Sequence, residues 1–185
     1  LEKREAKKEE KLDDVDDGGK PPAIAVLPFK NLSNDEEQEY FADGITEDII
    51  ANLSLWKTFP VISRNSSFSF KNSTEKSDVI SKALGARYLV EGSVRKAGNK
   101  VRITAQLTSA DDDKQIWSKR WDRSLEDIFE VQDEVSRDVA ALISPALKDQ
   151  EQVKLSTKGK KNFGAWDEYL QGLNIYNTQD FVGTT

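Results

Sequence analysis

Two polar loops carry the side chains of this sequence that are best suited to bind a ligand. Asn31 and Ser33 follow the first apolar segment of the chain, and Arg64, Asn65 and Ser66 follow the second. If the two segments are parallel neighbouring strands, both loops meet at one edge of the sheet, beside the start of a helix. A guanidinium together with free helix amides suits an anion or another polar ligand. The alternative is that the loops hydrogen-bond to each other and simply close this end of the domain.

Residues for catalysis or metal binding are scarce. The chain contains no His, Cys or Met, so the commonest general base and the thiolate zinc ligands are absent. The acidic run at residues 111–113 does not start an EF-hand loop, because Ile116 and Asp122 stand where Gly and Glu are required. Neither common glycine-rich phosphate loop occurs. We therefore expect no catalytic residue, no metal ion and no cofactor in this chain.

A group of basic residues lies on one predicted hairpin. Arg95, Lys96, Lys100 and Arg102 alternate with Val and Ile, which is typical of the solvated face of an antiparallel strand pair. A binding site for phosphate or for an acidic partner is the alternative interpretation of this group.

The overall composition favours one soluble domain with charged extensions. The chain has 185 residues, of which 37% are hydrophobic and 32% are charged, and its net charge of −6 argues against nucleic-acid binding. No apolar run reaches the roughly 18 residues of a membrane span, and the first residues lack the apolar core of a signal peptide. We expect a cytoplasmic location, with the periplasm as the alternative. The missing initiator Met indicates a part of a longer protein.

Hydrophobic periodicity predicts the elements that position the polar loops. A strand at residues 23–29 leads into a helix from about Asn34, with Ser33 and Glu36 as a capping box, that extends through Leu55. Gly44 inside this helix indicates close packing against the sheet, with the close approach of a ligand as the alternative.

A second short strand is expected at residues 61–63, followed by a polar loop over residues 64–74. A second helix is expected at residues 77–84, with Gly85 as its C-terminal stop.

The pattern then changes to the period of two that is typical of strands. Residues 88–95 and 101–107 flank a hairpin turn, and residues 115–121 form a third consecutive strand. Gly92 in the first of these strands indicates a bulge or a close backbone approach.

A long helix should start at a capping box made of Ser124 and Asp127. Pro145 should kink or end it.

This order predicts a mixed α/β (α+β) fold with a sheet of about five strands and helices packed on it: strand, helix, strand, helix, three strands, helix, and one trailing helix. We expect a charged linker at residues 1–21 and one α/β domain at residues 22–150. A second linker at residues 151–162 would lead to the start of a helical region at residues 163–185.

Several motifs in this order resemble the TolB-like amino-terminal domain of bacterial multidomain signalling proteins. The motifs are IAVLPFKNLS, EYFADGITEDI, VISRNSSF, YLVEGSVRKAGNKVRITAQL and IWSKRWDRSLEDIFEVQDEV, and the resemblance covers about residues 22–147. In such proteins the domain follows a class III adenylate/guanylate cyclase catalytic domain, or sometimes a winged-helix DNA-binding domain, and precedes tetratricopeptide repeats. The sequence AWDEYLQGLNIYN resembles the helix that opens this repeat region.

The resemblance implies no catalytic residue, because none is established for the family. Our leading hypothesis is a non-catalytic regulatory or protein-interaction module of a signalling protein, which contacts a protein partner or the neighbouring domains of its own chain. The alternative is a sensor of a small ligand or an anion that uses the two polar loops. We also expect a homodimer if the strand at residues 101–107 or the strand at residues 116–121 forms an uncovered edge.

Overall fold

The computed structural model describes residues 22–157 except 34, 37, 56 and 58. Within these residues the chain forms a mixed five-stranded sheet and four helices, which confirms the predicted α/β class. The elements are β1 (Ile24–Val26), β2 (Lys30–Asn31), α1 (Gln38–Leu55), α2 (Arg64–Phe68), α3 (Ser77–Leu84), β3 (Tyr88–Ala97), β4 (Lys100–Ser109), β5 (Lys114–Ser124) and α4 (Ile128–Thr157).

The sheet has the strand order β1-β3-β4-β5. β1 and β2 both run parallel to β3 and pair with it one after the other, whereas β3, β4 and β5 form an antiparallel meander. Pro28 lies between the two parallel strands, and because proline has no backbone N–H it cannot continue the ladder. β4 is a central strand, so of the two strands considered for self-association only β5 lies at an edge.

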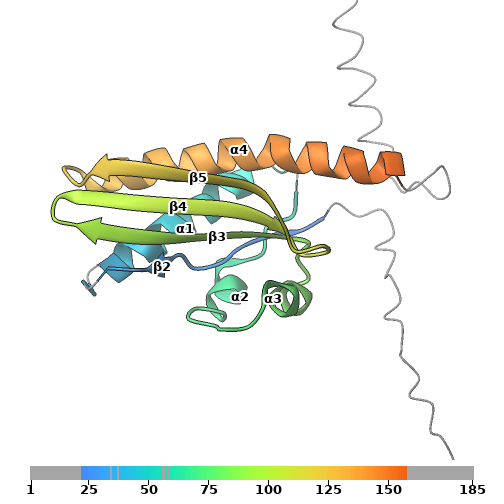
Figure 1. The fold of residues 1–185 in the computed structure, drawn as a ribbon, viewed down its shortest axis with the longest axis horizontal. Coiled ribbons are helices and arrows are strands. Elements are labelled where there is room, and N and C mark those ends of the chain that lie inside the picture. Colours follow the sequence, from blue (N-terminus) through green and yellow to red (C-terminus); the bar gives the residue numbers. More distant parts are fainter. Residues whose placement is uncertain (1–21, 34, 37, 56, 58, 158–185) are drawn as a thin grey trace, which may run out of the picture.

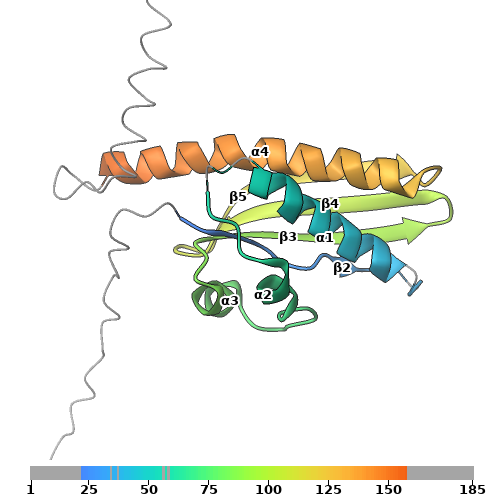
Figure 2. The same cartoon turned by 180° about the vertical axis from the view of Figure 1, so that it is seen from behind.

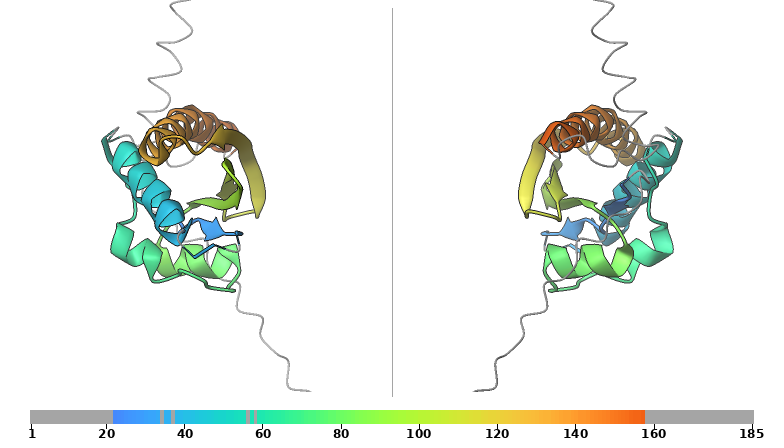
Figure 3. Two further views of the ribbon diagram at one scale, coloured as in Figure 1. Left: turned by 90° about the vertical axis from the view of Figure 1, so that its left-hand side faces the viewer. Right: turned by 90° about the vertical axis from the view of Figure 1, so that its right-hand side faces the viewer.

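The helices form layers on both sides of the sheet. Figure 2 shows α1 and α4 crossing over one face, and Figure 1 shows α2 and α3 below the β1 side of the sheet. In the end views of Figure 3, no helix of the described chain lies over the outer face of β4 and β5.

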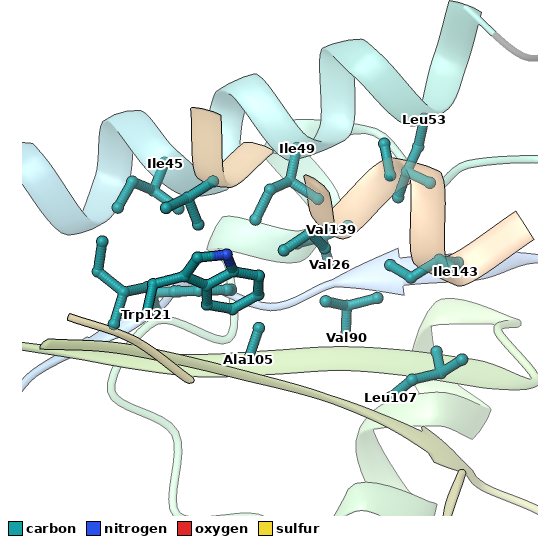
Figure 4. Close-up of a cluster of buried hydrophobic side chains, with 14 of the residues drawn as sticks. Val26, Ile45, Ile49, Leu53, Val90, Ala105, Leu107, Trp121, Val139 and Ile143 are labelled. Atoms are coloured by element: carbon teal, nitrogen blue, oxygen red, sulfur yellow. The ribbon is translucent and has the colours of Figure 1, made fainter. Parts of the chain in front are cut away.

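The main core lies between the sheet and the pair α1–α4. Figure 4 shows the apolar stripe of α1 and the facing stripe of α4 meeting side chains of all four main strands. Burial of each Val, Leu or Ile side chain in this core contributes roughly 1.5–3 kcal/mol. The members labelled in Figure 4 are Ile45, Ile49, Leu53, Val139, Ile143, Val26, Val90, Ala105, Leu107 and Trp121. A second, smaller core holds α3 on the opposite face through Ile80, Ala25, Leu27, Ala86 and Leu89.

Two glycines mark places where the layers approach closely. A Cβ on Gly92 would lie 2.3 Å from a ring carbon of Phe29, and the ladder is regular at this position, so a close approach and not a bulge explains this glycine. A Cβ on Gly44 would lie 2.2 Å from Nε2 of Gln132 on α4. Gly44 therefore packs against a helix, and the predicted contact with the sheet is wrong.

The second strand is much shorter than the sequence predicts. Only Val61 makes an isolated parallel bridge, to Ile24, and the chain then turns into α2 where a loop was expected. The reason is local: the side chain of Ser63 accepts a hydrogen bond from the amide of Ser66 and caps the new helix. The second parallel strand is instead β2, which contains Asn31 from the first predicted loop.

The starts of both long helices differ from the predicted capping boxes. α1 begins at Gln38, and Ser33 accepts a hydrogen bond from the amide of Lys96 instead of capping a helix. α4 begins after Asp127, whose Oδ1 accepts hydrogen bonds from the amides of Phe129 and Glu130. Ser124 belongs to β5.

α4 continues through Pro145 to Thr157, so of the two predicted effects of this proline, a kink or the end of the helix, the second is wrong. Ile143 and Leu147, on either side of it, are both fully buried and hold the helix on the core. The last residues of α4 thus lie in the segment expected to be a linker. The expected regions at residues 1–21 and 163–185 lie outside the described residues.

The predicted turns are confirmed. Gly85 ends α3 with a positive φ of 64°, and Gly98 turns the β3–β4 hairpin with a φ of 60°.

Within the described residues, no helix is both long enough and apolar enough to cross a membrane.

Candidate functional site

Asn31 and Ser33 shape the chain between β2 and α1. Oδ1 of Asn31 accepts a hydrogen bond from the amide of Ser33 (2.9 Å), and Nδ2 donates to the carbonyl of Asp35 (2.9 Å). Oγ of Ser33 accepts a hydrogen bond from the amide of Lys96 (2.8 Å). Such side-chain bonds stabilise a turn in place of helix or sheet bonds. A ligand at these two residues would therefore compete with existing hydrogen bonds.

The same two residues line an open groove of about 1010 Å³ at the start of α1. The other lining residues are Asp35, Glu36, Glu39, Tyr40, Asp43, Lys71 and Asn72. Four carboxylates and the ammonium group of Lys71 line the groove, and Nζ of Lys96 pairs with Asp35 at 3.2 Å. The remaining negative charge favours a cationic ligand over an anionic one.

Lys71 is the centre of the charge network in the groove. Its Nζ lies 2.7 Å from Oδ2 of Asp43 and 2.8 Å from Oε1 of Glu39. Burial alone would lower the pKa of Lys71, but the hydrogen bonds to Asp43 and Glu39 outweigh burial and raise it. The sequence analysis missed Lys71. The available signal was the i,i+4 pair of carboxylates on α1, which repel each other unless a cation lies between them.

The second predicted loop does not join the groove. Arg64, Asn65 and Ser66 form the first turn of α2, and Nε of Arg64 donates to Oε1 of Glu47 at 2.7 Å. The guanidinium also lies over the ring of Phe68, 4.1 Å from its centroid. The structure therefore brings Asn31 and Ser33 together at the groove. Arg64, Asn65 and Ser66 lie outside the groove.

A second polar cluster, which the sequence analysis also missed, is buried at the opposite end of the sheet. Glu151 of α4 is only 4% exposed, and its Oε1 accepts a short hydrogen bond from the hydroxyl of Tyr88. Its Oε2 lies 3.3 Å from Nη1 of Arg87, whose Nε lies 3.7 Å from Oδ2 of Asp111. A buried carboxylate is tolerated only when it is paired in this way.

The environment of Tyr88 keeps its hydroxyl protonated. Burial is the larger cause and the hydrogen bond to Glu151 adds to it, and together they raise the pKa of Tyr88 above its ordinary value. The hydroxyl therefore stays a donor to the carboxylate throughout the physiological range.

The start of the described chain meets α4 at this cluster. The carbonyl of Ala23 accepts hydrogen bonds from the amides of Arg87 (2.9 Å) and Tyr88 (3.2 Å), while the side chains of the same two residues hold Glu151. We call the four residues Ala23, Arg87, Tyr88 and Glu151 the junction. It joins the segment before β1 to the last third of α4.

Further contacts hold α4 along its length. Oδ2 of Asp138 accepts from Nζ of Lys119 (2.9 Å) and from Nε1 of Trp121 (3.0 Å), both on β5. Both bonds lower the pKa of Asp138 below its ordinary value, and the bond from Trp121 has the larger effect. On the other side, Nδ2 of Asn52 in α1 lies 3.0 Å from Oγ of Ser136. α4 is thus fixed to α1, to β5 and to the junction.

The structure is thus an α/β domain in which the charged residues of the groove and of the junction pair with one another. No group of three or more acidic side chains in the described part of the chain is placed to hold a metal ion. The family model of the TolB amino-terminal domain matches residues 14–116, and the chain belongs to this family. It is not a cyclase catalytic domain.

One curated relative of the chain is a longer protein. It is described as "Putative adenylate cyclase 3" of Rhizobium meliloti (strain 1021), and it is 49% identical over 146 residues, which are 79% of this chain and 25% of the relative. The chain therefore spans about a quarter of the length of this relative.

The solved structures to which the chain is similar include TolB from Acinetobacter baumannii, with a TM-score of 0.49 and 18% identity over 68% of this chain and 29% of that chain. The C-terminal domain of LpoB from Salmonella enterica has a TM-score of 0.46 and 19% identity over 59% of this chain and 87% of that chain.

Proposed function

We propose that this domain is a non-catalytic regulatory or protein-interaction module of a bacterial signalling protein, and that it follows an adenylate or guanylate cyclase catalytic domain. The name of the Rhizobium relative supports this proposal, and three quarters of that protein lie outside the matched region. On this proposal the domain is cytoplasmic, where the cyclase would find its nucleotide substrate. Tetratricopeptide repeats would begin at residues 163–185.

The junction is the observation that carries the proposal. The backbone of Arg87 and Tyr88 bonds to Ala23, and their side chains bond to Glu151. A displacement of the last third of α4 would therefore break or move contacts of the residues that also hold the start of the domain. If the junction has one arrangement with these contacts formed and another with them broken, it can couple the segment before β1 to the segment after α4.

The test uses both this chain and the full-length protein. Incubated with ATP or GTP and Mg²⁺ or Mn²⁺, the purified chain should form no cyclic nucleotide. In the full-length protein, replacement of the domain by a flexible linker should change the rate of cyclic nucleotide synthesis. Turnover by the chain alone would contradict the proposal. An unchanged rate after the replacement would contradict it as well.

A second candidate function is a small-ligand sensor, and the groove beside Asn31 and Ser33 favours it. Thermal unfolding with inorganic phosphate, nucleotides and spermidine tests this candidate. The charge of the groove predicts that spermidine raises the midpoint and that Asp43→Asn reduces the effect. Stabilisation by phosphate that Arg64→Ala abolishes would instead support the anion version. No stabilisation by any of these compounds would remove the candidate.

A further inference from the structure

One face of the sheet carries a positive charge that is only partly compensated, in a chain whose net charge is −6. Four basic residues share the outer face of the sheet at the end that contains the β3–β4 hairpin. They are Arg95 of β3, Lys100 and Arg102 of β4, and Arg120 of β5, and we call them the basic face.

The strand register places these residues together. Arg95 lies directly opposite Arg102, Arg102 lies opposite Asp122, and Arg120 lies opposite Thr104, two residues further along β4. Residues that are opposite or two apart share a face of a sheet. The alternate positions Val101 and Ile103 are buried against α1 and α4, so the basic face is on the side away from these helices.

The basic face is accessible. All four residues are exposed, and the side chains of Arg102 and Arg120 retain 52% and 61% of their accessible surface. Figure 3 shows the outer surface of β4 and β5 turned away from the helices.

The charges of the basic face are only partly compensated. Asp122 is the carboxylate among them: its Oδ1 lies 2.6 Å from Nε of Arg102, and its Oδ2 lies 3.6 Å from Nε of Arg120. Neither Arg95 nor Lys100 forms an ion pair with a described carboxylate. Glu91 lies further along the same face and accepts a hydrogen bond from Gln106 (3.2 Å).

The arrangement is unfavourable for the isolated sheet, because like charges directly opposite each other on neighbouring strands destabilise the pair. Arg95 and Arg102 stand in this relation. An anionic partner would relieve the repulsion, and guanidinium groups bind carboxylates in bidentate geometry.

The size of the basic face indicates which anion fits. With strands about 4.8 Å apart and a rise of about 3.3 Å per residue, the four cations cover roughly 10 by 13 Å. This area matches two or three carboxylates of one peptide segment. Duplex DNA, with a charge about every 1.7 Å, engages a longer basic surface. We propose that the basic face docks an Asp/Glu-rich segment of a protein partner. The inference gives the proposed interaction module a partner class, and to that extent it rests on the proposed function.

Fluorescence anisotropy of a labelled oligoglutamate peptide with the full 185-residue chain tests the proposal. The peptide should bind at low salt, and Arg95→Glu with Lys100→Glu should weaken binding about tenfold or more. The matched control reverses Lys82 of α3 and Arg137 of α4, which are exposed and lie elsewhere. It changes the net charge equally and should alter the affinity by less than about twofold. Equal losses in both variants, or no binding by the parent chain, would overturn the proposal.

A second variant and two further probes complete the test. Arg95→Gln with Lys100→Gln removes the charges without adding carboxylates, and it should also weaken peptide binding. Single-stranded DNA and vesicles containing phosphatidylserine should bind more weakly than the peptide. Tighter binding of either would assign the face to that other class of partner and overturn the proposal. Because peptide binding is measured on this chain alone, its failure is separate from a failure of the cyclase experiments.

Discussion

Removing the hydroxyl of Tyr88 perturbs the junction with little change in packing. In Tyr88→Phe the ring stays in the core, while Oε1 of Glu151 loses the hydrogen bond from the hydroxyl of Tyr88. A hydrogen bond to a charged group contributes about 1.5–3 kcal/mol. Since Tyr88 is 0% exposed and Glu151 is 4% exposed, solvent has little access to replace the lost donor. We predict a loss of about 2 kcal/mol in the free energy of unfolding.

Urea denaturation followed by circular dichroism measures this loss. With a slope of about 2 kcal/mol per molar urea, the midpoint should fall by about 1 M. The matched control is Tyr40→Phe, because Tyr40 is 85% exposed, and this variant should change stability by less than about 0.5 kcal/mol. A similar small change for Tyr88→Phe would refute the assignment of the junction as a stabilising contact.

The pH dependence gives an independent test of the same contact. The folded protein raises the pKa of Tyr88, so this group contributes stability that is fully present below the ordinary tyrosine pKa of about 10. As the pH rises above that value, the unfolded state loses the proton and the folded state keeps it, so the stability falls. The parent chain should therefore lose more stability than Tyr88→Phe above about pH 10. Parallel curves for the two proteins would contradict the environment that we assign to Tyr88.

Three further predictions concern other parts of the fold. Gly92→Ala should cost about 1–3 kcal/mol, because its Cβ would lie 2.3 Å from the ring of Phe29, and Phe29→Leu should recover part of this loss in urea denaturation; an unchanged midpoint for Gly92→Ala would argue against the close approach. The pKa of Asp138 is lowered, so its contribution is present above the ordinary carboxyl pKa of about 3.9 and disappears as the pH falls through the folded value; Asp138→Asn should therefore be less stable than the parent at pH 7 and equal to it in strong acid. The charged side chains on edge strand β5 favour a monomer in light scattering, whereas a dimer that Ser118→Pro dissociates would support self-association through this edge.

The meander could be predicted from the sequence because its pattern repeats over many residues. Period-two alternation in β4 places Val101, Ile103, Ala105 and Leu107 on the core side, and the turn at Gly98 fixes the register of the hairpin. Local signals also sufficed at Gly85, where a positive φ favours glycine.

The parallel part of the sheet could not be predicted in the same way. Its segments are only two or three residues long, so a single side chain can determine whether they form a strand. The helix cap formed by Ser63 ends one predicted strand, and Pro28 divides another into β1 and β2. Such competition between a local hydrogen bond and a strand ladder leaves little trace in the hydrophobic pattern.

The candidate sites show the same limit at longer range. The position of Asn31 and Ser33 near the start of α1 follows from chain order. The ion pairs of Lys71 with Glu39 and Asp43 of α1 depend on tertiary packing. The junction joins Tyr88 to Glu151, which are 63 residues apart and belong to no motif. Only the packing of α4 across the sheet brings them together.

The proposed coupling through the junction is tested most directly by cyclic nucleotide synthesis in the full-length protein carrying Tyr88→Phe. Coupling free energies of about 0.5–2 kcal/mol predict a rate that differs from the parent by about 2–30-fold. Phe129→Tyr, at a residue that is 74% exposed and lies outside both the groove and the junction, should leave the rate unchanged. Circular dichroism would establish that both variants are folded at the assay temperature. A folded Tyr88→Phe protein with the parental rate would contradict the account.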